Sequence, residues 1–219
     1  MKIEKKDSPW AYLWYALYAF AGLGLEMVLL GVIEPVLWGS AGEYGTVQRV
    51  VHWSLTSVCW AAVILLLIRG ARRELEFDVR NCHKVPLGSI LLSLVLVAAC
   101  IWLNAYDWGT LKIVGEFTRK KGIEFLFQYL YYGFEMGLVF LIVAFGQRFG
   151  EGLLHRQSNI PFGGMVLCST WGAVHILSKG SVATGLGVMA FAIVYGILYV
   201  VLNRNTKLTY LAMLLAFII

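Results

Sequence analysis

The sequence predicts an all-helical membrane protein in which residues 1–219 form one bundle of about seven transmembrane helices. The chain is 59% hydrophobic and only 14% charged, and its mean hydropathy is +0.73. A soluble domain of this length needs far more charge on its surface. The apolar runs are continuous rather than alternating, which excludes a membrane β-barrel.

The apolar segments follow one another along the whole chain. A spanning helix needs about 20 mostly apolar residues. Six segments reach or approach this length and a seventh is short, at 10–33, 48–68, 86–104, 123–147, 161–178, 182–202 and 208–219. Glu34-Pro35 is expected to end the first helix, and Glu26 lies about two turns deeper in it. The last segment is expected to be a half-span packed within the bundle.

The segment 105–122 has a different pattern. Charged residues such as Lys112 and Glu116 alternate with apolar ones such as Val114 and Phe117. This pattern is typical of an amphipathic helix that lies in the membrane interface. An ordinary solvated loop explains the composition equally well, so both interpretations stay open.

The basic residues predict how the bundle is oriented. With seven spans, 12 lysines and arginines fall on the side of the N-terminus, among them Lys2, Lys5 and Lys6, and 6 fall on the other side. Because cytoplasmic loops carry the excess of positive charge, we expect a multi-pass protein of the cell membrane with a cytoplasmic N-terminus. The lipid bilayer is then its first partner.

Several kinds of site are not indicated by the sequence. It has no basic helix and no basic stripe with aromatic residues, so we expect no nucleic-acid partner. Cys82 and His83 are adjacent but lack the spacing of a metal site, and we expect no metal. No motif identifies a cofactor, which leaves the cofactor unknown.

The segment 123–147 is the most polar of the predicted spans. Glu124, Gln128, Tyr131 and Glu135 are spaced so that they share one helix face. An ionisable group at membrane depth usually faces a bundle interior or a water-filled cavity, which favours a functional role for Glu135. For the other three residues, we expect a supporting polar stripe, and hydrogen bonding between helices explains them equally well. Glu124, near the interface, fits that structural role best.

His175 lies at a depth similar to that of Glu135. With a rise of 1.5 Å per residue, Glu135 lies roughly 18 Å and His175 roughly 21 Å from the same membrane face. Their helices are expected to be antiparallel neighbours, so the side chains could come within direct or one-water hydrogen-bond reach. A carboxylate and an imidazole together can activate a water molecule. His52, near the start of its helix, is interpreted instead as an interfacial or capping residue.

The region 123–219 resembles the CAAX-protease and bacteriocin-processing family of intramembrane proteases. Glu135 stands where that family's first glutamate motif begins, and Trp171-Gly-Ala-Val-His175 is similar to its second motif. The resemblance implies a CAAX-protease-like core and an intramembrane endopeptidase that acts on a membrane peptide or protein. In such an enzyme Glu135 and His175 are the catalytic residues.

The sequence also departs from the family pattern. Met136 replaces the second glutamate, Phe140 replaces the arginine, and Met213 and Phe217 replace the late histidine and asparagine that stabilise the oxyanion. Two functions therefore stay open. The chain is either a divergent glutamate- and histidine-dependent peptidase with degenerate motifs, or a non-catalytic relative that serves as a membrane scaffold, immunity factor or small-solute binder.

Overall fold

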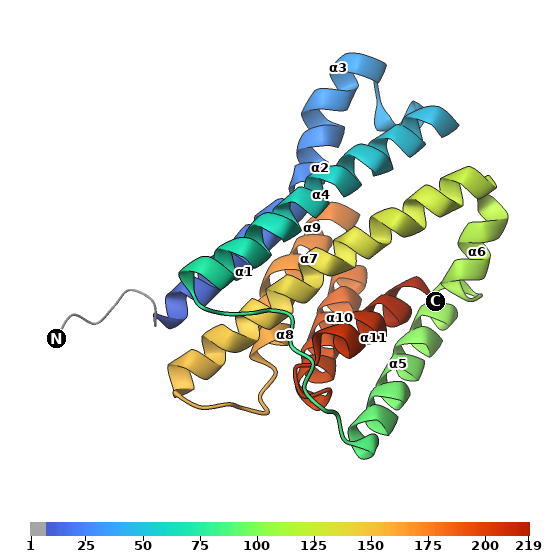
Figure 1. Cartoon of the computed structure of the whole chain (residues 1–219). Helices are drawn as coiled ribbons and strands as arrows, with labels where there is room; N and C mark the ends of the chain where they lie inside the picture. The colour runs from blue at the N-terminus through green and yellow to red at the C-terminus, as the bar shows by residue number, and fades with distance from the viewer. Residues whose placement is uncertain (1–7) are drawn as a thin grey trace.

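The computed structural model describes residues 8–219, and every regular element in that range is helical (Figure 1). Lys2, Lys5 and Lys6, which contribute to the predicted orientation, lie outside the described residues. The prediction of an all-helical protein is confirmed for residues 8–219.

The helices follow the predicted apolar segments, with one correction: Glu34-Pro35 does not end the first helix, which continues to Trp38 because a proline is tolerated in the first turn of the helix Glu34–Trp38. Four short elements form one continuous rod over Pro9–Trp38: α1 (Pro9–Leu23), α2 (Leu25–Val28), the π-helical turn η2 (Leu29–Ile33) and α3 (Glu34–Trp38). The other elements are η3 (Ala41–Glu43), α4 (Thr46–Glu74), α5 (Leu87–Trp108), α6 (Lys112–Arg119), α7 (Gly122–Leu154), α8 (Phe162–Leu167), η4 (Cys168–Gly172), α9 (Ala173–Lys179), α10 (Val182–Val201) and α11 (Thr206–Ile218).

Five helices in the described part of the chain are long and apolar enough to cross a membrane. They are Pro9–Trp38, α4, α5, α7 and α10. The predicted span 161–178 is helical but interrupted by the π-helical turn η4. The predicted short last span is α11, with 13 residues. A membrane protein is thus supported, and the count of seven spans stays a prediction.

Helix α7 lies at the centre of the bundle. It runs beside α1 and α4 on one side and packs against α8 and α11 on the other (Figure 1). Its residues Leu138–Phe145 are all buried. A helix that is apolar all round is stable only when neighbours cover every face. We call the end of the bundle where α1 begins and α7 ends the near end, and the opposite end the far end.

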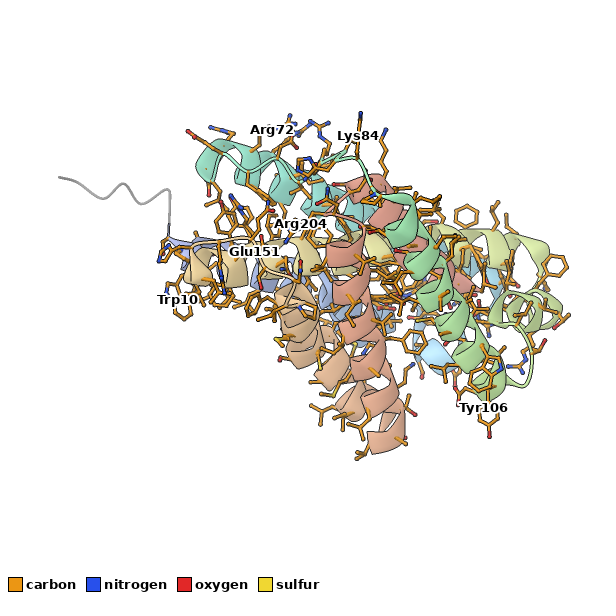
Figure 2. All side chains as sticks on the ribbon, turned by 90° about the horizontal axis from the view of Figure 1, so that it is seen from below. Trp10, Arg72, Lys84, Tyr106, Glu151 and Arg204 are labelled. Atoms are coloured by element: carbon orange, nitrogen blue, oxygen red, sulfur yellow. The ribbon has the colours of Figure 1, made fainter. Side chains whose placement is uncertain are left out.

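The outer surface of the bundle is rich in exposed apolar side chains. Helix α5 alone exposes Leu91, Leu94, Val95 and Trp102 by about half or more of their surface. The exposed aromatic residues Trp10 and Tyr106 lie on opposite sides of the molecule (Figure 2). Such a surface is too apolar for water and suits contact with lipid acyl chains.

The segment 105–122 contains a short helix, α6, rather than a loop throughout. Residues 105–108 continue α5, and only Lys112–Arg119 form a separate helix. Lys112 and Glu116 are buried against the bundle, whereas Val114 and Phe117 are exposed. The helix is therefore amphipathic, as one of the two interpretations expected, and its apolar face points outward.

Three glycines bring α8 unusually close to its neighbours. A methyl group added to Gly163 would lie 2.1 Å from the carbonyl oxygen of Val143 on α7. A methyl group on Gly196 of α10 would lie 2.4 Å from the backbone nitrogen of Gly164. Backbones approach this closely only where side chains are absent. Helix α8 is thus held between α7 and α10 by direct backbone contact.

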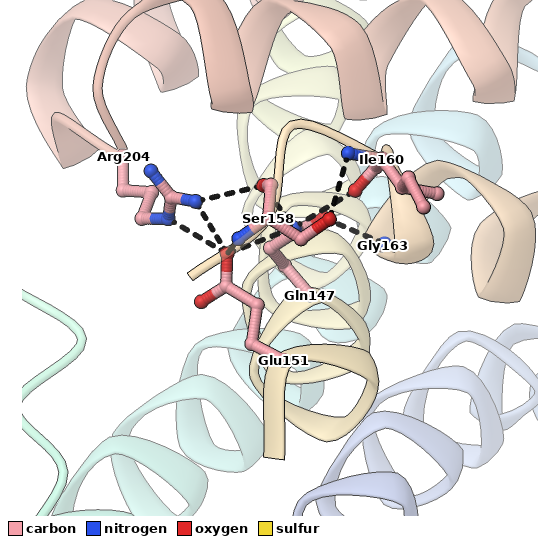
Figure 3. A network of polar contacts seen from close by, with 6 residues as sticks. All are labelled: Gln147, Glu151, Ser158, Ile160, Gly163 and Arg204. Atoms are coloured by element: carbon pink, nitrogen blue, oxygen red, sulfur yellow. Dashed lines mark hydrogen bonds and ion pairs between the residues drawn. The ribbon is translucent and has the colours of Figure 1, made fainter. Parts of the chain in front are cut away.

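A buried polar network fixes the near end (Figure 3). The Glu151 carboxylate of α7 accepts hydrogen bonds from the Arg204 guanidinium and, at 3.0 Å, from the Gln147 side chain. Gln147 also donates to the carbonyl of Ile160 at 3.0 Å and accepts from the backbone N–H of Gly163 at 3.1 Å. The network therefore joins α7, the loop before α8, and the turn between α10 and α11.

The first prediction tests the glycine contacts. Gly163→Ala should destabilise the protein by about 1–3 kcal/mol, because the new methyl group overlaps backbone atoms that cannot rotate away. Gly187→Ala on α10 is the control, since nothing lies within 4 Å of a methyl group at that position. Thermal unfolding in detergent measures both variants. Equal unfolding temperatures for the two would contradict the close packing of α8.

The second prediction concerns the buried ion pair. Arg204→Met leaves the Glu151 carboxylate buried without its cation, and losing one partner of such a pair costs about 3–5 kcal/mol. The double variant Glu151→Gln/Arg204→Met removes the orphaned charge and should recover part of this loss. Arg73→Met, at an exposed position of α4, is the control. A double variant no more stable than Arg204→Met, measured by the same unfolding assay, would show that the charge pair is not the source of the loss.

Candidate functional site

Glu135 lies in α7 with a partly buried side chain. The charged groups that act on its carboxylate come from three other elements: Glu26 of α2, Lys112 of α6 and Lys179 of α9. The Trp171 side chain of η4 lies near the same carboxylate. Glu135 is therefore directed into the bundle, as expected for an ionisable group at this depth.

His175 lies one turn after Trp171, at the far end of the α8–α9 helix. Its Nδ1 is 2.6 Å from the backbone carbonyl oxygen of Trp171, and the two rings meet with centroids 4.8 Å apart. A carbonyl oxygen can only accept, so Nδ1 carries the hydrogen in this arrangement. The neutral ring then presents Nε2 as its proton acceptor.

The two predicted catalytic residues meet at Trp171 rather than at each other. In the described part of the chain, no direct hydrogen bond or ion pair joins Glu135 and His175. Trp171 packs against the His175 ring and lies near the Glu135 carboxylate. Helix α8 packs against α7, whereas α9, which carries His175, packs against α10. The predicted reach through one water molecule stays a prediction.

The predicted supporting stripe on α7 contacts three neighbouring helices, α4, α6 and α2. Glu124 lies 4.0 Å from the Arg49 guanidinium of α4. Gln128 donates to Tyr132 and, at 3.3 Å, to Glu116 of α6. Tyr131 donates to Glu26 of α2 at 2.8 Å. For Glu124 and Gln128 the contacts fit the structural interpretation, in which polar groups hold neighbouring helices together.

Lys112 of α6 also joins elements at the far end. Its ammonium group donates to the Phe217 carbonyl at 3.0 Å and lies 3.8 Å from the centre of the Phe217 ring. Burial lowers the pKa of Lys112, and the nearby Glu116 carboxylate offsets part of this effect. The ammonium is thus a buried point charge that fixes the end of α11 against α6 and α7.

The positions of the family's late motif carry no hydrogen-bond donor side chain. Met213 is completely buried, and Phe217 packs against Tyr132 with ring centroids 5.1 Å apart. Both side chains belong to the packed interior of α11. Any oxyanion stabilisation at this site must therefore come from other groups.

His52 is the ionisable residue whose surroundings sequence reasoning missed. It is not a capping residue: it lies six residues inside α4 and is 6% exposed. Its Nδ1 is 2.8 Å from a carboxylate oxygen of Glu34, and its Nε2 is 3.6 Å from one of Glu26. Glu34 is completely buried and also accepts a hydrogen bond from Tyr44 at 3.1 Å.

The π-helical turn η2 explains why both glutamates face His52. Eight α-helical steps from Glu26 to Glu34 would leave their side chains roughly 80° apart around the axis. Five residues in the wider π geometry turn by about 18° less per residue, which removes about 90° in total. The two carboxylates therefore share one face. No pattern in the sequence marks such a turn.

Metal-ligand groups and cavities were the other kinds of candidate site. Among residues 8–219, no group of three or more His, Cys, Asp or Glu side chains is arranged to hold a metal ion. A cavity of about 170 Å³ lies at the near end, lined in part by Asn81, Gln147, Arg148 and Arg204. Neither Glu135 nor His175 lines this cavity.

Comparison with family models, with curated proteins and with solved structures found no match to this chain. The resemblance to the CAAX-protease family therefore stays a prediction from the sequence. The local geometry of Glu135, Trp171 and His175 is the basis of the proposed function.

Proposed function

We propose that this chain is a divergent CAAX-protease-like protein of the cell membrane in which Glu135 and His175 activate water for attack on a membrane peptide. In this proposal α8–α9 and α11 complete a bundle of seven spans, and the N-terminus is cytoplasmic. The observation that supports the proposal is the position of Trp171, which packs against the His175 ring and lies near the Glu135 carboxylate. A carboxylate and an imidazole thus lie near one indole ring within the bundle.

The geometry of His175 supports a role as general base. With Nδ1 bonded to the Trp171 carbonyl, the free Nε2 is the atom that takes a proton from water. In this proposal Glu135 orients that water or stabilises the imidazolium that forms. The water O–H bond breaks and its proton passes to Nε2, while the water oxygen bonds to the peptide carbonyl carbon and the π electron pair moves to the carbonyl oxygen. The C–N bond then breaks as that carbonyl re-forms, and the proton on Nε2 passes to the leaving amine nitrogen.

A second function is favoured by the late motif. Met213 and Phe217 donate no hydrogen bonds, and losing a single oxyanion donor typically lowers the rate by roughly 10²–10³. In a non-catalytic relative, Glu135 and His175 hold helices together or bind a small solute or partner. The packing of Met213 in the interior of α11 is the observation that favours this alternative.

The third prediction decides between the two functions. Wild-type protein in nanodiscs is incubated with a library of membrane-embedded peptides, and cleavage is followed by mass spectrometry. Glu135→Gln and His175→Asn should each lower the cleavage rate about 100-fold or more, as expected for loss of a general base and its partner. Glu43→Gln and His155→Asn are matched controls at exposed positions.

Thermal unfolding of the same four variants separates chemistry from folding. Wild-type protein that cleaves no peptide, together with loss of stability in Glu135→Gln and His175→Asn, would favour the non-catalytic function. Cleavage that survives in both variants would reject Glu135 and His175 as the catalytic pair.

The fourth prediction tests the orientation. Cys82 is exposed in the loop between α4 and α5, which the positive charges assign to the cytoplasm. In a variant with Cys59, Cys100 and Cys168 changed to serine, an impermeant maleimide should label Cys82 only after cells are permeabilised. Glu43→Cys in the background without Cys82 is the control, because its exposed far-end position should label in intact cells. The reverse pattern would invert the proposed topology.

A further inference from the structure

Glu34, His52 and Glu26 form a row of ionisable side chains in the far half of the bundle. We call this set the His52 row. One ring nitrogen of His52 faces a Glu34 oxygen at 2.8 Å and the other faces a Glu26 oxygen at 3.6 Å. Since an ionised carboxylate only accepts hydrogen bonds, both nitrogens can donate at once only when the ring is an imidazolium. Either carboxylate alone satisfies a neutral ring.

The groups around the row are neutral donors rather than competing cations. Tyr44 donates to the second oxygen of Glu34 at 3.1 Å, and Tyr131 of α7 donates to Glu26 at 2.8 Å. The nearest arginine on α4, Arg49, pairs with Glu124 of α7 instead. In the described part of the chain, no lysine or arginine forms an ion pair with Glu26 or Glu34. The His52 ring is thus the basic group that both carboxylates share.

We propose that the His52 row is an intramembrane proton-transfer site, in which the imidazole carries a proton between Glu34 and Glu26. The Glu34 carboxylic acid gives its proton to Nδ1, which leaves a Glu34 carboxylate and an imidazolium. The Nε2–H bond then breaks, and the proton forms an O–H bond on Glu26. One proton has moved from one glutamate to the other, and the neutral ring has changed its tautomer.

The two glutamates of the row lie at different depths in the bundle. Glu34 lies near the far end and is completely buried, whereas Glu26 lies about two turns deeper and is 27% exposed. A proton that passes from Glu34 to Glu26 therefore moves from a completely buried group to a partly exposed one. Glu26 and Glu135 are close enough for their negative charges to repel each other. Chains of acidic and histidine side chains within membranes are typical of proton relays.

The proton-transfer site does not depend on the proposed peptidase chemistry. It uses neither His175 nor Trp171, and it is complete without a peptide substrate. The competing interpretation is a permanent ion pair that only holds the Pro9–Trp38 rod against α4. A permanent pair keeps one protonation state, whereas a carrier must be able to change its tautomer.

The fifth prediction measures that tautomer. The full chain is labelled with ¹⁵N in its histidine rings and studied by NMR in nanodiscs, and His52→Asn assigns the His52 signals. In Glu34→Gln the ring should be neutral with its hydrogen on Nε2, toward Glu26. In Glu26→Gln the hydrogen should lie on Nδ1, toward Glu34. The ratio of the two tautomers should therefore invert by at least about tenfold between the variants, the effect of about 1.4 kcal/mol.

Arg49→Gln is the control, because it changes a charge on the same helix without touching the row, and it should leave the His52 ring as in wild type. One fixed neutral tautomer in wild type and both glutamate variants would overturn the proposal. An imidazolium that persists in both variants would overturn it too, because the proton would then be held by some other group. Unchanged His175 signals in the same spectra show that each variant is folded.

If Glu34→Gln fails to fold, Tyr44→Phe replaces it. This variant keeps both carboxylates but removes the phenol that stabilises the charged form of Glu34. Glu34 should then hold the proton more firmly, which shifts the His52 ring toward its neutral form. A ring population identical to wild type would show that Glu34 and His52 do not share a proton.

Discussion

The structure depends most on the direct backbone contact that holds α8 between α7 and α10. Gly163 meets the Val143 carbonyl on one side, and Gly164 meets Gly196 on the other. Between helices in lipid, the hydrophobic effect contributes little, so close packing and hydrogen bonds must hold them together. The Gln147 side chain adds to this by accepting from the Gly163 N–H. The position of α8 then sets where Trp171 and His175 lie relative to Glu135.

Much of the fold follows from the sequence because the bilayer imposes a simple rule. Each run of about 20 apolar residues must become a helix, since no other local structure satisfies its backbone in lipid. For this reason 48–68, 86–104, 123–147 and 182–202 correspond to α4, α5, α7 and α10. The sequence does not distinguish helix α6 from a loop, because charged and apolar residues at alternating positions suit both a loop and an interfacial helix. Its buried Lys112 and Glu116 contact groups on α7 and α11 that only the tertiary structure brings together.

Residues of the candidate site can be predicted only where an ionisable side chain lies in the middle of an apolar run. Glu135 lies in the middle of an apolar run and is visible in the sequence. His52, Glu26 and Glu34 each lie nearer the end of a span, where a polar residue is ordinary. Their association depends on the π-helical turn η2, which rotates Glu34 onto the face of Glu26. Hydrophobic periodicity does not report such a turn, because Leu29–Ile33 is apolar at every position except Gly31.

Helix α7 joins the two polar regions of the molecule. Its near end carries Gln147 and Glu151, which are fully satisfied by Arg204 and by backbone groups. Its far half carries Tyr131, which donates to Glu26, and Glu135, which lies near Glu26, Lys112 and Lys179. In a network whose polar groups all have partners, a change of charge would break hydrogen bonds. Such a network therefore holds the helices together. Carboxylates that share one imidazole can change their charge with little rearrangement, so chemistry or proton movement in this protein is expected in the far half of the bundle.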